Sequence, residues 1–319
     1  MRWGVLGATA QVAQAAVMPA LAASPKCHLV AVASQSRPAG GYQTFGAERV
    51  LPSYESVLAD PEVEAVYVPL PNSLHAEWSV RAAEAGKHVL CEKPLATNAM
   101  EASAIASACD AAGVVLMEAY MTPFHPRSAL LDDILRSGRL GELRFARTAF
   151  TWVLEDESNH RWSPAFGGGA LLDVGIYCLA PLLIAADRRP IDISAQSVMT
   201  AGGVDSSFSG WLDFGRGFTA VFECSFETPA RQRVEVVGTE GAVTIDRPFT
   251  PGLHDRVITL LHRDGRTEEL QAAGGDSYRG MVDHFATVLR GGARLRRTAL
   301  DSIELLTLIN RLKVAAASQ

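Results

Sequence analysis

The fold is decided by the stretch Arg2-Trp3-Gly4-Val5-Leu6-Gly7-Ala8-Thr9-Ala10-Gln11-Val12-Ala13. Residues 2–7 have the composition of a buried β-strand, and residues 12–23 show a helical pattern. A glycine turn between a strand and a helix lets a pyrophosphate approach the N–H groups at the start of the helix, as in dinucleotide-binding folds. We therefore expect Gly7, Ala8 and Thr9 to contact the phosphates of a dinucleotide. Because Thr9 stands at the second glycine position of the G-x-G-x-x-G pattern, a plain strand-turn-helix connection is the alternative.

Short apolar runs alternate with helical patterns through the first third of the chain. Besides residues 2–7, we expect strands at residues 29–34, 65–68, 88–91 and 114–117. We expect helices at residues 12–23, 53–59, 74–85 and 100–111. This alternation predicts an α/β fold, a Rossmann-type doubly wound parallel sheet with helices on both faces, over residues 1–122. In that setting the Gly7 turn favours cofactor binding.

The pattern changes after about Pro123, where strands follow one another through short, turn-rich links. Strands are expected at residues 143–152, 193–200, 206–214, 218–226, 233–237, 242–245 and 256–261, and helices at residues 128–136, 170–184, 278–289 and 302–314. Because short links favour antiparallel pairing, we expect residues 123–319 to form an α+β domain with a large, open, mostly antiparallel sheet. Its last helix can pack back on the first domain. An open sheet exposes apolar area that a second copy can cover, so we expect a homodimer or a homotetramer.

Composition limits the class of protein. The 319 residues are 48% hydrophobic and 20% charged, which is typical of a folded globular protein. Lys and Arg number 29 against 35 Asp and Glu, a net charge of −6, and no basic cluster indicates a nucleic acid or a membrane surface as a partner. Five widely spaced cysteines without a C-x-x-C pair predict neither a disulfide framework nor a metal site, and they favour a reducing, cytoplasmic location. A secretory signal is the less favoured interpretation of the uncharged run from Trp3 to Pro25, because glycine and polar residues interrupt it.

The end of the second expected strand indicates which dinucleotide binds. An NAD site places an acidic residue there to accept from the ribose hydroxyl, whereas the 2′-phosphate of NADP requires a cation and hydroxyl groups. Residues 27–47 contain no Asp or Glu, and Ser34 and Arg37 follow the strand. We therefore expect NADP, with Ser34 and Arg37 at its phosphate. NAD stays an alternative, in which Arg37 is only a solvated loop cation.

Lys93 follows the expected strand at residues 88–91, at the edge where open α/β sheets hold ligands. A lysine there can donate to a substrate hydroxyl and can stabilise negative charge on the oxygen that loses its proton. Pro94 stiffens the turn, and a cis bond before it would aim the amine toward the ligand. The alternative is a solvent-facing lysine.

A second group of candidate residues follows three consecutive glycines, residues 167–169, which let a loop pack tightly before a helix. Asp173 and Tyr177 are four residues apart and therefore project from the same helix face. An acid and a phenol on one face, with a lysine from the other domain, form a candidate proton-transfer site. The alternative is a buried tyrosine bonded to an acid in a helix contact. Arg161 and Trp162 favour a ring-stacking, hydroxyl-rich substrate, although the tryptophan equally fits a core position.

Four segments in order resemble the Gfo/Idh/MocA oxidoreductases: residues 66–75, 86–94, 118–126 and 167–177. The similarity covers nearly the whole chain, and it is greatest to the branch that contains glucose-fructose oxidoreductase, dimeric dihydrodiol dehydrogenase and NADP-dependent D-xylose dehydrogenase. The resemblance implies a Rossmann domain for NADP, a C-terminal open-sheet domain that often mediates oligomerisation, and a substrate cleft between them.

The resemblance also implies cofactor contacts. Pro69, Asn72 and His75 would line the cofactor pocket, and Glu92 and Lys93 would lie beside the nicotinamide ribose and the reacting carbon. The sequence departs from the family pattern at two positions, both in the expected Rossmann domain. The turn at residues 7–10 lacks the second glycine and carries one extra residue, and residue 35 is a glutamine where many NADP-using relatives have an arginine.

The resemblance also implies residue roles at the substrate: Asp173 binds the substrate, Tyr177 is the acid/base, and Arg161 lies near the substrate. These residues predict an NAD(P)-dependent oxidoreductase that transfers a hydride between the nicotinamide and a hydroxyl or carbonyl group of a sugar-like or cyclic diol substrate. Lys93, Tyr177 and Asp173 are the expected catalytic residues, and Arg161 and Trp162 the expected substrate contacts. Two alternatives are a cofactor-sensing regulator without catalysis and an NAD-dependent glycosidase of the same superfamily.

Overall fold

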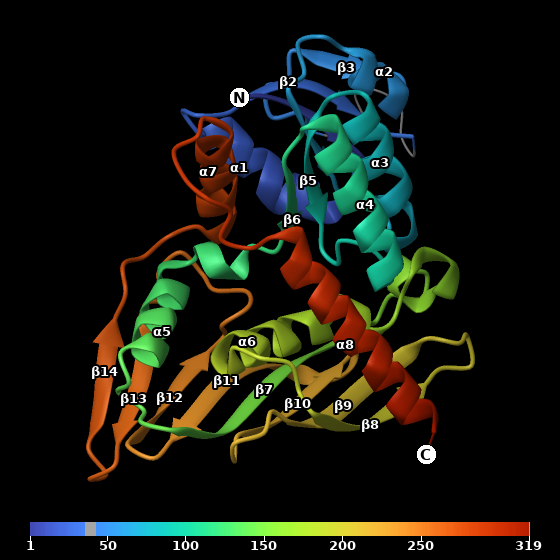
Figure 1. Cartoon of the computed structure of the whole chain (residues 1–319). Helices are drawn as coiled ribbons and strands as arrows, with labels where there is room; N and C mark the ends of the chain where they lie inside the picture. The colour runs from blue at the N-terminus through green and yellow to red at the C-terminus, as the bar shows by residue number, and fades with distance from the viewer. Residues whose placement is uncertain (36–42, 319) are drawn as a thin grey trace. The chain divides into compact units, whose positions relative to one another are not determined.

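The computed structural model describes residues 1–35 and 43–318, and its contacts divide the chain into two compact units (Figure 1). The first unit comprises Met1–Met121 and Ser277–Glu304, and the second comprises Thr122–Asp276 and Leu305–Gln319. The segment 277–304, which the sequence pattern placed in the second domain, thus has its contacts in the first unit. Aromatic packing contributes to this grouping, because the rings of Trp3 and Phe285 lie 5.4 Å apart and both side chains are fully buried.

The first unit contains a six-stranded parallel sheet in the order β3-β2-β1-β4-β5-β6, which confirms the predicted Rossmann fold. Its strands are β1 (Arg2–Leu6), β2 (His28–Ala33), β3 (Arg49–Leu51), β4 (Ala65–Val68), β5 (His88–Glu92) and β6 (Leu116–Ala119). Its helices are η1 (Ala13–Val17), α1 (Met18–Ala23), α2 (Tyr54–Ala59), η2 (Asn72–Leu74), α3 (His75–Glu84), α4 (Ala99–Ala112) and α7 (Ser277–Leu289). Because the strands are parallel, their carboxyl ends meet at one edge of the sheet, where such sheets hold ligands.

Polar side chains cap the starts of two of these helices, and glycines follow the ends of two. The side chains of Ser53 and Asn98 accept from backbone N–H groups at the starts of α2 and α4, at 3.2 and 3.0 Å. Gly86 and Gly113 follow α3 and α4 with φ of +71° and +67°, a left-handed conformation that suits glycine. The helices expected at residues 53–59, 74–85 and 100–111 are therefore confirmed.

The first helix departs from regular α-helical geometry. Residues Ala13–Val17 form a π-helical segment that passes into α1 at Met18. A π-helical turn holds one more residue than an α-helical turn, and this segment follows closely on the turn at residues 7–10. A second π-helical segment, η6 (Leu171–Gly175), precedes α6 (Ile176–Ala186) in the second unit.

The second unit is built on an eight-stranded sheet in the order β14-β13-β12-β11-β7-β10-β9-β8. All neighbouring strands are antiparallel except β7 and β10, so the predicted open, mostly antiparallel sheet is confirmed. The strands are β7 (Leu143–Val153), β8 (Asp192–Met199), β9 (Asp205–Asp213), β10 (Thr219–Ser225), β11 (Glu227–Gly238), β12 (Gly241–Asp246), β13 (Val257–His262) and β14 (Thr267–Gln271). The other elements are η3 (Thr122–Phe124), α5 (Pro126–Arg136), η4 (His160–Trp162), η5 (Pro164–Phe166) and α8 (Ala299–Ala317), whose first residues belong to the first unit. Figure 1 shows α5 and α6 on the same side of the sheet.

The helical region formed by η6 and α6 is the core of the second unit. Among the described residues, Pro164–Ala186 is the one helical region long and apolar enough to cross a membrane, and 78% of its most apolar window is buried inside the protein. Thr148 on β7 donates from Oγ1 to the carbonyl oxygen of Cys178 on α6 at 3.0 Å, which fixes the helix on the sheet. Its burial against the sheet identifies this region as a core helix.

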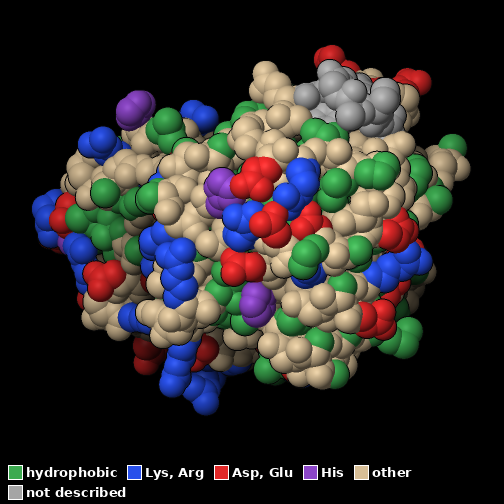
Figure 2. Space-filling model, turned by 90° about the horizontal axis from the view of Figure 1, so that it is seen from above, with side chains coloured by type: hydrophobic (Ala, Val, Ile, Leu, Met, Phe, Trp, Pro, Cys, Tyr) green, Lys and Arg blue, Asp and Glu red, His purple; other side chains and the backbone are tan. Residues whose placement is uncertain are grey.

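The opposite face of the eight-stranded sheet is uncovered in the part of the chain that the structure describes (Figure 1). It presents a shallow hollow whose lining includes Phe145, Arg147, Trp211, Val221 and Glu223. Arg147 and Glu223 form an ion pair across neighbouring strands at 3.6 Å. On the face of the molecule seen in Figure 2, side chains of both charges are interspersed, as expected for a chain with a small net charge.

Candidate active site

The turn after β1 lies tightly against its neighbours. The N–H groups of Gly7 and Ala8 both donate to the carbonyl oxygen of Ala33, the last residue of β2, at 2.9 Å. Gly7 has a φ of +102°, and a Cβ atom there would come within 2.8 Å of Leu70 Cδ2 and 3.4 Å of the Pro69 carbonyl oxygen. Glycine is therefore required at position 7, as the nucleotide-binding interpretation expects.

Two hydroxyl groups lie beside this turn. The Oγ1 atom of Thr9 and the Oγ atom of Ser34 are 2.9 Å apart, and Ser34 directly follows β2. The structure thus brings Gly7, Ala8, Thr9 and Ser34 together at the carboxyl edge of the parallel sheet. Arg37, the cation expected at the 2′-phosphate, lies outside the described residues.

His75 connects two loops of the same edge. It is fully buried, and its Nδ1 and Nε2 atoms lie 2.7 Å from the carbonyl oxygens of Pro94 and Leu70. Because each carbonyl oxygen only accepts, both contacts are hydrogen bonds when both ring nitrogens carry a proton. Burial lowers the pKa of His75, and the two carbonyl oxygens act against that effect. His75 thus links the loop after β4, which contains Pro69 and Asn72, to the turn after β5.

Lys93 lies in the turn directly after β5, and the Lys93–Pro94 peptide bond is cis. The preceding residue, Glu92, is buried and accepts from the Tyr67 hydroxyl at 2.7 Å and from the Lys93 N–H group at 3.1 Å. Burial raises the pKa of Glu92, while the Tyr67 hydroxyl and the Lys93 cation oppose that effect. The carboxylate that the sequence assigned to the cofactor pocket is therefore also a support for the backbone of Lys93.

Glu118 on β6 supports the other side of this turn. Its Oε1 atom accepts from the Leu95 N–H group at 2.9 Å, and its Oε2 atom accepts from Arg297 Nε at 2.9 Å and from Ser302 Oγ at 2.8 Å. Sequence reasoning did not identify Tyr67, Arg297 or Ser302 as functional. Arg297 is 179 residues from its partner in the chain, so no local spacing indicates the contact.

In the second unit, the structure joins two of the expected substrate residues. Arg161 donates from Nε to Oδ2 of Asp173 at 2.7 Å. The guanidinium carbon of Arg161 lies 5.9 Å from the centre of the Trp152 ring, within range of a cation–π contact. Asp173 is buried, so this ion pair fixes the carboxylate at the start of the helical region.

The glycines before η6 make this arrangement possible. The N–H groups of Gly168 and Gly169 donate to the carbonyl oxygens of Ser163 and Arg161, each at 3.0 Å. A Cβ atom at Gly168 would lie 2.3 Å from the Arg161 carbonyl oxygen. Side chains larger than hydrogen would therefore force the loop with Arg161 away from the helix that carries Asp173.

Tyr177 lies one turn further along, at the start of α6, in an aromatic cluster. Its ring centre is 5.5 Å from that of Phe150 and 5.7 Å from that of Phe249, and only 6% of Tyr177 is exposed. Trp162, expected at the substrate, packs edge-on against Phe226 with ring centres 5.4 Å apart. It is only partly buried, so this contact is compatible with both interpretations of the tryptophan.

The candidate residues thus form two groups, each within one unit. The first unit holds the Gly7 turn, Ser34 and Lys93 at the carboxyl edge of one parallel sheet, and the second holds Asp173 and Tyr177 on one helical region. Among the described residues, no group of three or more His, Cys, Asp or Glu side chains is arranged to hold a metal ion.

Two family models match the chain. The model described as oxidoreductase family, NAD-binding Rossmann fold, matches residues 1–120, and the model described as GFO/IDH/MocA C-terminal domain matches residues 129–244. The chain belongs to the Gfo/Idh/MocA family of oxidoreductases. This membership confirms the resemblance seen in the sequence and makes the first unit an NAD(P)-binding domain.

Individual relatives match nearly the whole chain. D-xylose 1-dehydrogenase (NADP(+)) 2 of Haloferax volcanii is 34% identical over 321 residues, which cover 99% of this chain and 97% of the relative. A dTDP-3,4-didehydro-2,6-dideoxy-alpha-D-glucose 3-reductase of Streptomyces antibioticus is 33% identical, with 99% and 97% covered. The structure of KijD10, a 3-ketoreductase from Actinomadura kijaniata in complex with NADP and TDP-benzene, matches with a TM-score of 0.90 at 30% identity, covering 99% of this chain and 97% of that one.

Proposed function

We propose that this oxidoreductase transfers a hydride between NADP and a hydroxyl or carbonyl group of a sugar-like substrate, with a cyclic diol as the second substrate class. The observation that carries the proposal is the position of Lys93. This lysine and the glycine turn at Gly7 both follow the carboxyl ends of strands in one parallel sheet. Relatives named for D-xylose and for a dTDP-linked ketosugar support the substrate class.

NADP is the favoured cofactor. Residues 27–47 contain no carboxylate to accept from a ribose 2′-hydroxyl, and the hydroxyl of Ser34, directly after β2, can donate to a 2′-phosphate. The xylose dehydrogenase relative is named for NADP, and KijD10 was solved with it. The cofactor supplies the hydride acceptor or donor. The chain supplies binding, orientation and the acid–base groups.

The proton transfer is assigned to Tyr177 and Lys93. Tyr177 takes the proton of the substrate hydroxyl during oxidation and returns it during reduction. The Lys93 cation stabilises the negative charge that develops on the same oxygen, and Asp173 orients the substrate together with Arg161. KijD10 has been solved with one lysine substituted and with one tyrosine substituted, the same two residue types.

The test is an assay of the purified protein with NADP+ or NAD+ and a panel of D-xylose, D-glucose and cyclic diols, followed by NADPH or NADH absorbance. We expect turnover with at least one sugar, and a loss of about a hundredfold or more in Lys93→Ala and in Tyr177→Phe while NADPH still binds. A protein that binds NADPH but turns over nothing in the panel supports the regulator alternative. Cleavage of a glycoside without net cofactor change supports the glycosidase alternative.

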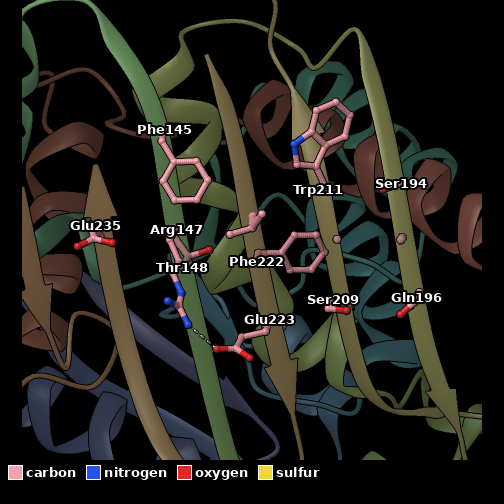
Figure 3. A pocket seen from close by; sticks show the side chains of 13 residues that line it. Phe145, Arg147, Thr148, Ser194, Gln196, Ser209, Trp211, Phe222, Glu223 and Glu235 are labelled. Atoms are coloured by element: carbon pink, nitrogen blue, oxygen red, sulfur yellow. Dashed lines mark ion pairs between the residues drawn. The ribbon is translucent and has the colours of Figure 1, made fainter. Parts of the chain in front are cut away.

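We also propose that the uncovered face of the eight-stranded sheet pairs with a second copy of this chain, giving a homodimer or a homotetramer. Figure 3 shows Glu235, Arg147 and Glu223 on adjoining strands of this face, and Trp211 on the next strand beyond Glu223. A face that carries both charges and apolar side chains can be complementary to the same face of a second copy turned by a two-fold axis. Light scattering should give the mass of an oligomer, and Trp211→Glu should give a monomer while the exposed control Val314→Glu should not.

For location, we propose the cytoplasm. All five cysteines are free, and four of them are buried, which suits a protein kept in a reducing compartment. Fractionation of the native host with an antibody against the chain tests this assignment.

A further inference from the structure

The backbone that follows Lys93 is fixed by two buried side chains. The Nδ1 atom of His75 lies 2.7 Å from the carbonyl oxygen of Pro94 and donates to it in the tautomer that carries the proton on Nδ1. The next N–H group, that of Leu95, donates to Oε1 of Glu118 at 2.9 Å. The turn that carries the amine is therefore tied to two separate elements, the start of α3 and β6.

Glu118 is itself held by the C-terminal segment of the first unit. Arg297 Nε and Ser302 Oγ donate to its Oε2 atom at 2.9 and 2.8 Å. The side chains of Arg297 and Glu118 are only 10% and 4% exposed, so this ion pair is shielded from water. Both donors come from the segment 277–304, far from Lys93 in sequence.

Three hydrogen bonds to one carboxylate fix its orientation, with Oε1 turned toward Leu95 and Oε2 toward the C-terminal segment. Without Arg297, a buried carboxylate would keep its charge without a counter-charge, which is strongly unfavourable. Two further titratable groups, Glu92 and His75, also interact electrostatically with Glu118. The carboxylate would therefore rotate, and the Leu95 N–H group would lose its acceptor.

We propose that Arg297 and Ser302 are positioning residues for Lys93, acting through Glu118 and the Leu95 N–H group. The inference rests on the proposed role of Lys93 in the proton transfer. A displacement of about 1 Å in a catalytic group can cost roughly a hundredfold in rate, so a support that holds the turn affects turnover more than binding. The C-terminal segment thus completes the active site without contacting the substrate.

The first experiment compares Arg297→Met and Ser302→Ala with the control Asp301→Ala. The control removes the side chain that accepts from Thr298 at the start of α8, but leaves all three donors to Glu118. With NADP+ and the sugar that the panel identifies, we expect kcat to fall about tenfold or more in Arg297→Met and about threefold in Ser302→Ala. The KM for NADP+ should stay within about twofold of the original, and Asp301→Ala should keep its kcat.

A double-mutant cycle separates this inference from the proposed function. If Arg297 acts through the lysine, Arg297→Met should have almost no further effect on kcat in a Lys93→Ala background. Full additivity of the two substitutions overturns the positioning role. A Lys93→Ala variant with unchanged turnover instead overturns the proposed role of Lys93 itself.

A spectroscopic readout needs neither substrate nor cofactor. The chain contains four lysines, Lys26, Lys87, Lys93 and Lys313, so reductive 13C-methylation gives few NMR signals, and Lys93→Arg assigns the one of interest. We expect Ser302→Ala and Arg297→Met to move or broaden the Lys93 signal and to leave the other three in place. If Arg297→Met does not fold, Ser302→Ala decides the question, and an unchanged Lys93 signal with unchanged kcat in that variant overturns the proposal.

Discussion

Arg161 and Asp173 form a single ion pair, with Nε of the arginine 2.7 Å from Oδ2 of the aspartate. The Arg161 side chain is 27% exposed and that of Asp173 is 12% exposed. The carboxylate therefore holds the guanidinium in place, while the guanidinium keeps enough open surface to meet a polar ligand. This division suits a residue that positions a hydroxyl-rich substrate.

Asp173→Asn keeps the shape of the side chain but removes its charge, so Arg161 loses its fixed orientation. We expect the KM for the sugar substrate to rise about tenfold, the scale of one hydrogen bond to a charged group. The KM for NADP+ should not change, and Asp156→Asn, a change in an exposed turn, is the matched control. An unchanged KM for the sugar would place Asp173 outside the substrate site.

Tyr67→Phe removes the hydroxyl that donates to buried Glu92 at 2.7 Å. That hydroxyl lowers the pKa of Glu92 against the larger effect of burial, because it stabilises the ionised carboxylate. We expect the free energy of unfolding to fall by about 2 kcal/mol at neutral pH, as for other hydrogen bonds to a charged group.

The effect of Tyr67→Phe should also depend on pH. The pKa of Glu92 is higher in the folded than in the unfolded protein, so stability falls as the pH rises from the unfolded to the folded value. The Tyr67 hydroxyl offsets part of that loss of stability, but only at pH values at which Glu92 is ionised. Urea unfolding at about pH 7 and about pH 4 should therefore give a smaller difference between the two proteins at the lower pH. Equal differences at both values contradict this assignment.

Gly169→Ala should strongly destabilise the second unit. Gly169 has a φ of +109°, and a Cβ atom there would lie 2.3 Å from Oδ1 of Asp205, whose other oxygen accepts from the Leu171 N–H group. We expect backbone strain and crowding together to lower the free energy of unfolding by at least about 3 kcal/mol. Gly203→Ala has a φ of +88° and open space around it, so it measures strain alone and should cost about 1 kcal/mol. Equal losses in the two variants would show that the contact with Asp205 is not restrictive.

Ser34→Asp should reverse the cofactor preference. A carboxylate beside Thr9 repels a 2′-phosphate but accepts from the two ribose hydroxyls of NAD. We expect the ratio of kcat/KM for NADP+ to that for NAD+ to fall by about a hundredfold. Ser34→Ala, which removes the hydroxyl without adding charge, should change the ratio far less. A ratio unaffected by the aspartate would mean that the 2′ position does not lie at Ser34.

The sequence predicted the strands that form a short apolar run and the helices that are followed by a glycine. The strand expected at residues 65–68 is β4, and Gly113 ends α4 as expected. Two strands were not predicted, β3 and β14. Both lie at the edges of their sheets and bury little apolar surface, so their residues lack the apolar run that marks an inner strand.

Candidate site residues could be predicted from the sequence where one short motif contains the reactive side chains. Lys93 follows a strand and Asp173 and Tyr177 share a helical region, so spacing alone groups them with their neighbours. The supports of Lys93 were not predictable in this way. Glu118 and Arg297 meet only because the chain returns to the first unit after the second, and a single sequence gives no spacing for such a contact.

That return of the chain to the first unit also affects folding during translation. Trp3 packs against Phe285, so the first residues to leave the ribosome wait for partners that are translated after the whole eight-stranded sheet. The nucleotide-binding unit therefore begins first but is completed only after the eight-stranded sheet has been translated, and a nascent chain stopped at Asp276 would expose the indole of Trp3 to chaperones.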